Sequence, residues 1–193
     1  MSGFRAVTLA FALALIGSAA HAFGVADLQR LLRAAPAPGA AGIAFHELRE
    51  SPWLAAPVES RGSLHSTPAL LEKRLVSPRR EVWRIRADRI EWSDPGAADA
   101  AAPRQILFSD APGVATLAGA LRRIVGAELL ALEADFRIET GGDERVWTAR
   151  LVPRDAGVAR KLEAIELQGT GARLRVIVVV ERQGERTTTR LDP

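Results

Sequence analysis

Hydrophobic and polar residues alternate in many short segments of the chain, which is typical of strands with one buried face. In segment 81–87, Trp83 and Ile85 fall on one side of a strand, whereas Arg84 and Arg86 fall on the other. The alternation continues through residues 90–92, which favours an antiparallel pair. The strands predicted from such segments span 42–50, 58–66, 70–75, 81–87, 105–109, 135–140, 145–152, 162–168, 173–181 and 185–191.

Two other segments repeat hydrophobic residues at helical spacing. The first, 23–35, ends at Pro36, because proline cannot continue a helix. The second begins near Asp110, which we expect to cap it, and ends at Gly126 before a shorter helical turn over 127–132. The apolar face is formed by Val25, Leu28, Leu31 and Leu32 in the first helix and by Val114, Leu117, Ala118, Leu121, Ile124 and Val125 in the second.

The order of these elements predicts an α+β fold built on antiparallel strands. The five strands after residue 134 follow one another through short turns, as in a meander. No alternation of strand and helix occurs that would indicate a parallel sheet. We therefore expect about nine to eleven short strands, one helix in front of them and one long helical insertion between two halves of the sheet.

Residues 1–22 have the three regions of a secretory signal peptide. Arg5 supplies the positive charge, an apolar run follows over 6–16, and the segment ends in Ala20-His21-Ala22. The apolar run is about half of the roughly 20 residues that a membrane-spanning helix needs. We therefore expect cleavage after Ala22 and export of residues 23–193 as a single domain.

Composition and charge exclude several classes of function. The 193 residues contain no cysteine and three histidines, so disulfide scaffolds, zinc fingers and thiol nucleophiles are excluded and no metal site is expected. The net charge is only +3, which predicts no strong affinity for phosphate backbones and no nucleic-acid partner. The arginine-rich segment 73–86 is interleaved with acids and is expected to form a solvated, convex sheet face.

No motif for catalysis stands out. Ser63 and His65 would lie side by side on one strand, but no orienting acid is close in sequence, and His46 has no nucleophile beside it. Neither HExxH nor GxSxG occurs, and Gly169-Thr170-Gly171 joins two strands without the helix that a phosphate-binding loop needs. We therefore expect no enzyme and no cofactor; the alternative is a hydrolase at His46 or His65, which would need a cleft with a serine and an acid beside the histidine.

Several pieces of the sequence, in order, resemble the LolA-like family of outer-membrane lipoprotein carriers. Individually each is a strand-and-turn pattern, and their order and spacing behind a signal peptide carry the resemblance. The pieces are Leu28-Gln29-Arg30-Leu31-Leu32, Phe45-x-Glu47-x-Arg49, Pro57-Val58-x-Ser60-x-Gly62-x-Leu64, Leu71-Glu72-Lys73 with Pro78 and Glu81, Phe136 before Trp147-x-x-x-Leu151-x-Pro153, Ile165-x-Leu167-x-Gly169 and Gly184-Glu185-Arg186-Thr187.

This resemblance implies an incomplete, strongly curved antiparallel β-barrel with helices covering its concave apolar face. It also implies a monomeric, non-catalytic periplasmic carrier that moves acylated cargo, such as a lipoprotein, a glycolipid or a fatty acyl product, from an inner-membrane donor to an outer-membrane acceptor. The residues expected to line the lipid cavity and its lid are Leu28, Leu31, Phe45, Trp83, Ile85, Trp92, Phe108, Leu117, Leu121, Trp147, Leu151, Ile165, Leu167, Val176 and Val178.

Two further points follow from the resemblance. The family uses an arginine that follows a lysine and precedes a proline; here Arg74 follows Lys73, but Pro78 comes three residues later than that pattern requires. The alternative to a carrier is a periplasmic structural or interaction module, whose barrel is filled by its own side chains. A continuous apolar cavity between sheet and helices would distinguish the carrier from the module.

Overall fold

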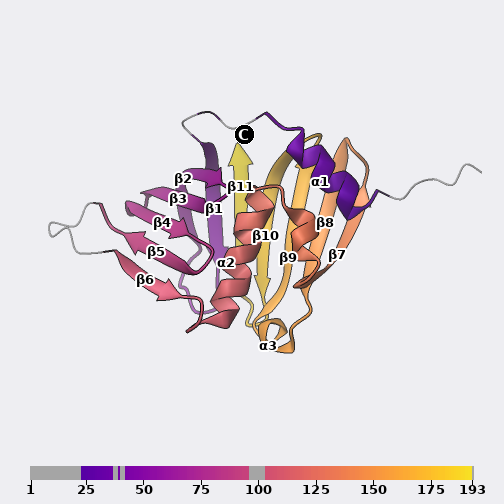
Figure 1. Ribbon diagram of the computed structural model, residues 1–193. Coiled ribbons are helices and arrows are strands. Elements are labelled where there is room, and N and C mark those ends of the chain that lie inside the picture. The colour runs from indigo at the N-terminus through magenta and orange to yellow at the C-terminus, as the bar shows by residue number, and fades with distance from the viewer. Residues whose placement is uncertain (1–22, 37–38, 40–41, 96–102, 193) are drawn as a thin grey trace, which may run out of the picture.

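A computed structural model of the protein describes residues 23–36, 39, 42–95 and 103–192. Its centre is one antiparallel sheet with the strand order β6-β5-β4-β3-β2-β1-β11-β10-β9-β8-β7 (Figure 1). The expected signal peptide lies outside the described residues. The strands are β1 (Ile43–Glu50), β2 (Val58–Thr67), β3 (Leu70–Ser77), β4 (Glu81–Ile85), β5 (Arg89–Ser93), β6 (Arg104–Leu107), β7 (Phe136–Gly142), β8 (Val146–Pro153), β9 (Leu162–Thr170), β10 (Arg173–Glu181) and β11 (Arg186–Asp192).

The sheet consists of two meanders that meet in its middle. Strands β1 to β6 form one meander and β7 to β11 form the other, as predicted for the second half of the chain. The meanders are joined because β1 pairs with β11 over seven residues, from Ala44 opposite Asp192 to Glu50 opposite Arg186. In the described sheet, β6 and β7 are the two edges and do not pair with each other. The expected open, incomplete barrel of antiparallel strands is therefore confirmed.

The strands form where the sequence alternates. In β8, Trp147, Ala149 and Leu151 are buried, whereas Val146 and Thr148, on either side of Trp147, are exposed. Successive side chains of a strand point to opposite faces, so this pattern buries one face of the sheet and leaves the other towards solvent.

Helices lie on one face of the sheet, here called the inner face; the opposite one is the outer face. Figure 1 shows α2 (Pro112–Val125) crossing in front of the centre of the sheet and α1 (Val25–Arg33) in front of β7 and β8. A 3₁₀ turn, η1 (Leu129–Leu132), follows α2 and packs against α1. The expected front helix, central helix and shorter helical turn are all present.

Two local predictions need correction. Asp110 does not cap α2: the residue before the helix is Ala111, which makes no side-chain cap bond, and the Asp110 carboxylate accepts a hydrogen bond from Ser109 at 2.9 Å. The connection after β8 contains a further one-turn helix, α3 (Ala156–Ala159), which Asp155 caps by accepting from the Val158 amide at 2.8 Å. Four residues are too few for a hydrophobic period to show in the sequence.

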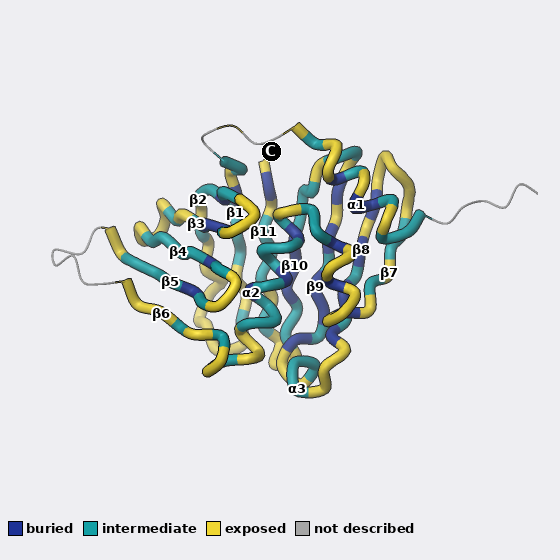
Figure 2. Tube along the Cα trace, viewed as in Figure 1, coloured by how far each residue is buried: buried dark blue, intermediate teal, exposed yellow. Residues whose placement is uncertain are grey.

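Most of the core lies between the helices and strands β7 to β10 (Figure 2), and Phe45, Leu64, Leu71, Ile85 and Ile90 extend it over the other half of the sheet. Trp147 is the largest side chain in it, and its indole Nε1 donates to the Gly171 carbonyl at 2.9 Å. The other large side chains with less than 2% exposure are Phe136, Leu28, Ile124, Leu129, Leu132, Leu151, Ile165 and Leu167. Within the described residues, none of the helices combines the length and the apolar character that crossing a membrane requires.

Candidate functional site

A pocket of about 550 Å³ opens at one end of the inner face. It lies among the last residues of α1 and α2, the turn between β2 and β3 and the turn between β9 and β10. This volume falls in the range of roughly 300–1,000 Å³ that small-molecule sites have. Its larger apolar wall residues are Leu32, Ile43, Ile124, Val125, Leu174 and Leu191.

Small residues keep this space unfilled. Ala35, Gly126 and Ala172 line the pocket with little or no side chain, at points where α1 and α2 have ended and where β9 turns into β10. Gly42, also in the lining, has a φ of +75°, and a Cβ there would lie 2.5 Å from the Leu64 carbonyl oxygen. The backbone can therefore approach β2 closely only because residue 42 is glycine.

Arginines hold the pocket walls together. Arg33, in the last turn of α1, donates from Nε to the Ala127 carbonyl at 3.1 Å, and so links α1 to the segment after α2. Arg122, in the last turn of α2, donates from Nη1 to the Pro68 carbonyl at 3.0 Å, and so links α2 to the β2–β3 turn. Basic residues at these positions also suit the negative ends of the helix dipoles.

A protein family matches this chain over almost its whole length. The family described as "Outer membrane lipoprotein carrier protein LolA-like" matches residues 18–192. The chain belongs to this LolA-like family. Among solved structures, a LolA superfamily protein from Nitrosomonas europaea is similar over 86% of this chain and 90% of its own, with 10% sequence identity and a TM-score of 0.42. No curated protein matches the chain.

None of the fifteen residues predicted for the cavity lines the pocket of this LolA-like protein. Five of them, Leu28, Trp147, Leu151, Ile165 and Leu167, are at most 1% exposed and fill the core instead. The Trp147 ring lies over Gly169, where a Cβ would come within 2.0 Å of it. In this arrangement these five side chains pack against one another in the core and do not border the pocket.

A second group of predicted residues lies on the inner face of the β1–β6 half. Phe45 and Ile85 are buried, whereas Trp83 and Trp92 are half-buried and stack with ring centroids 5.4 Å apart. Lys73 lies on the same face, with its ammonium 4.9 Å from the centre of the Phe45 ring. Phe108 is half-buried and packs against the core from the connection to α2.

The other predicted helix residues, apart from the fully buried Leu28, are half-buried. Leu31 of α1 and Leu117 and Leu121 of α2 all pack against the core without being fully covered. The residues of α2 that are fully covered include two small ones, Ala118 and Ala120. The helix therefore approaches the sheet closely through alanines, and its leucines lie towards the sides of the contact.

Val176 and Val178 lie on the outer face, contrary to the prediction. Val178 is opposite Glu166 and Thr188, whereas Ile177 belongs to the core and is opposite Leu167. Residues opposite each other in neighbouring strands share a face, so the two valines point away from the helices. A run of five apolar residues, 176–180, carries no alternation from which the inward side could have been read.

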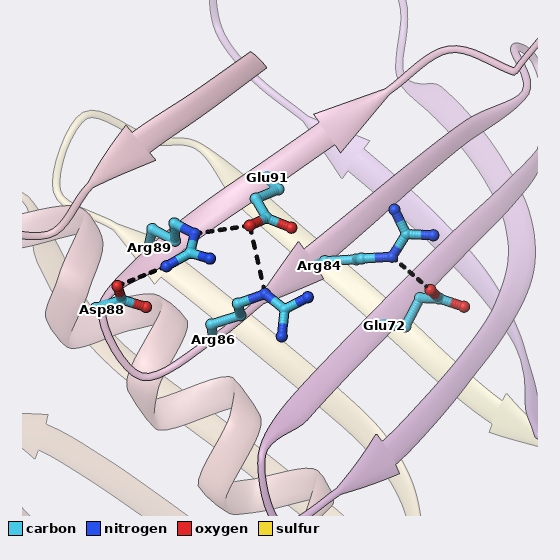
Figure 3. Close-up of polar contacts among 6 residues, drawn as sticks. All are labelled: Glu72, Arg84, Arg86, Asp88, Arg89 and Glu91. Carbon is cyan, nitrogen blue, oxygen red and sulfur yellow. Dashed lines mark hydrogen bonds and ion pairs between the residues drawn. The ribbon is translucent and has the colours of Figure 1, made fainter. Parts of the chain in front are cut away.

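The outer face of the β1–β6 half carries the arginine-rich segment, as expected. Leu71 belongs to the core, so Glu72 beside it points outward, where it accepts hydrogen bonds from Arg74 and, at 2.9 Å, from Arg84 (Figure 3). Burial raises the pKa of Glu72, but the hydrogen bonds from Arg74 and Arg84 outweigh it and hold that pKa below its ordinary value. Arg74 therefore pairs with a carboxylate on the face of the sheet that points away from the helices.

A second set of ion pairs continues this face (Figure 3). Glu91 lies 2.6 Å from Arg89 and 3.3 Å from Arg86, and Arg89 also pairs with Asp88 at 2.7 Å. The hydrogen bond from Arg89 is the main cause that lowers the pKa of Glu91. Arg86 and Arg89 are thus paired with neighbouring carboxylates on this face.

The histidines are not arranged for catalysis. His65 Nε2 lies 3.4 Å from Ser63 Oγ, but Glu72, its neighbour on β3, is bound by arginines instead. His46 Nε2 lies 3.8 Å from a Glu59 carboxylate oxygen at the surface. Among the described residues, no group of three or more acidic or histidine side chains could hold a metal ion.

Proposed function

We propose that residues 23–193 form a periplasmic carrier that binds the acyl part of a lipid or lipoprotein and moves it between the inner and outer membranes, after cleavage of residues 1–22. The description of the family to which the chain belongs supports a carrier of lipid-modified cargo. The acyl part would enter the pocket at the end of the inner face.

The observation that carries this proposal is the volume of the pocket together with its walls. About 550 Å³ stays unfilled beside Leu32, Leu174 and Leu191, while the β7–β10 half of the same face is closely packed. Each CH₂ group that an acyl chain transfers from water to such walls contributes about 0.8 kcal/mol. A chain of several methylenes would therefore bind with useful affinity without any covalent step.

Filling the pocket tests the proposal. Ala172 lines it from the two-residue turn between β9 and β10, so Ala172→Trp adds a large side chain without interrupting a strand. We expect this variant to lose most of the lipid that is recovered by organic extraction and mass spectrometry from protein purified out of the periplasm. The matched control is Ala87→Trp, in the exposed turn between β4 and β5 and outside the pocket.

Two results would count against the carrier. One is the recovery of no lipid from the unaltered protein under conditions in which a known carrier retains one. The other is equal lipid recovery from Ala172→Trp and Ala87→Trp. Either result favours the alternative, a non-catalytic interaction module whose barrel is filled by its own side chains. The closely packed core beside β7 to β10 is compatible with that alternative.

A further inference from the structure

The pocket carries an excess of positive charge. Arg33, Arg122 and Arg173 line it together with Glu128, which gives these described residues a net charge of +2. The carboxyl ends of α1 and α2 also lie here, and each contributes about −0.5 of an elementary charge. The helix ends offset part of the formal charge of the lining side chains.

Two of these arginines have no carboxylate partner within the described residues. Arg33 and Arg122 donate to the backbone carbonyls of Ala127 and Pro68, respectively. Within the described residues, neither arginine forms an ion pair with an acidic side chain. Backbone carbonyls satisfy single N–H groups but carry no net charge. The charge of Arg33 is exposed to water, whereas that of Arg122 is partly removed from it, so an anion in the pocket would compensate Arg122 above all.

Arg122 has the more demanding position. Its side chain is half-buried, and its Nε is shielded from solvent without making a hydrogen bond in the described structure. A guanidinium has five N–H donors in one plane, and a buried donor without an acceptor is unfavourable. A carboxylate or phosphate can accept two of these donors at once, which a neutral hydroxyl group cannot do.

Apolar walls adjoin these donors. Val125, three residues along α2 from Arg122, and Leu174, directly after Arg173 in β10, are half-buried and line the pocket. The same pocket therefore presents apolar walls to the hydrocarbon chain of an amphiphile and guanidinium groups to its head group.

We propose that the pocket selects single acyl chains that end in an anionic group, a carboxylate or a phosphate, which Arg122 and Arg33 bind. This selectivity rests on the proposed function, since it presumes that the pocket takes an acyl chain. It names the class of cargo that the pocket prefers: anionic over neutral amphiphiles of equal chain length.

Displacement of the neutral dye Nile red from the purified protein, residues 23–193, tests the selectivity. The competitors are hexadecanoate, hexadecyl phosphate and hexadecanol, which share a chain and differ in the head. We expect both anions to displace the dye at concentrations about tenfold or more below that of hexadecanol, since hydrogen bonds to charged groups contribute more than neutral ones. The anion that displaces at the lower concentration shows whether a phosphate or a carboxylate head fits better.

The variants assign the effect to residues. Arg122→Gln should reduce the advantage of the anions over hexadecanol, compared within the same variant, to less than about threefold, because it removes the charge that binds the head. Arg33→Gln, at an exposed position, gives a second reading if Arg122→Gln folds poorly. Arg190→Gln, at an exposed position of β11 outside the pocket, is the control and should behave as the unaltered protein.

The outcomes separate the two proposals. Equal displacement by hexadecanoate, hexadecyl phosphate and hexadecanol would overturn the selectivity and leave the carrier standing. An anion advantage that survives both Arg122→Gln and Arg33→Gln would also overturn it. Failure of the unaltered protein to bind either the dye or any of the three competitors would instead contradict the proposed function itself.

Discussion

Glu72 shows how a single carboxylate can stabilise the solvent-facing side of the sheet. Its side chain is largely covered, and Arg74 and Arg84 both bind its carboxylate on the outer side of β3 and β4. A buried carboxylate is tolerated when hydrogen bonds to cations compensate its loss of water. The alternation around Trp83 and Ile85 was enough to predict that this face is polar, although the partners of each arginine depend on strand register.

A pH titration of stability tests this arrangement. The pKa of Glu72 is lowered in the folded protein, so its contribution is fully present above the ordinary carboxyl value of 4.5 and is lost as the pH falls through the lower folded value. We expect Glu72→Gln to lower the unfolding midpoint in urea at pH 7, and the difference from the unaltered protein to shrink below pH 4.5. Glu144→Gln, at an exposed position, is the control. A difference that stays constant with pH would contradict the role of the carboxylate charge.

At the scale of elements, α1 is held in place by a polar contact as well as by its leucines. Gln29 is 9% exposed, and its Oε1 accepts a hydrogen bond from the Leu130 amide of η1 at 2.9 Å. The apolar stripe of α1 predicted the helix and the burial of Leu28. It gave no sign of Gln29, because a glutamine beside a leucine stripe is equally compatible with an exposed position.

Replacing Gln29 tests the contact between α1 and η1. Gln29→Leu keeps the size of the side chain but leaves the Leu130 amide without its acceptor, which costs about 1–3 kcal/mol in the free energy of unfolding. Chemical unfolding followed by circular dichroism measures this loss. Ala26→Leu, at an exposed position of the same helix, should change stability by less than about 0.5 kcal/mol. Equal effects of the two changes would show that the hydrogen bond is unimportant.

At the scale of the whole molecule, the sequence predicts the strands better than the cavity. Most strands were predictable because they have their own alternation, as β8 has with Trp147, Ala149 and Leu151. The pocket instead combines the ends of elements far apart in the chain, such as Leu32, Ser66 and Leu174. Their meeting depends on the register of β1 against β11 and on where α1 and α2 stop, which no local pattern contains.

The pairing of β1 with β11 should therefore be the most sensitive point of the sheet. Thr188, opposite Leu48 in β1 and Val178 in β10, lies in the middle of this sheet. Thr188→Pro removes a backbone donor from a central strand, where proline is essentially not found. We expect this variant to be recovered mainly as aggregate, whereas Thr188→Val, which keeps the amide and the β-branched shape, stays soluble. Size-exclusion chromatography distinguishes the two, and a soluble, monomeric Thr188→Pro protein would contradict the expectation.

The union of the earliest and the latest strand also governs when the molecule can become native. Until β11 has emerged, β1 and β10 each lack a neighbour on one side. Contacts between segments so far apart in the chain form slowly, because a long loop must close first. The pairing that joins the two meanders is therefore a late event in the folding of this chain.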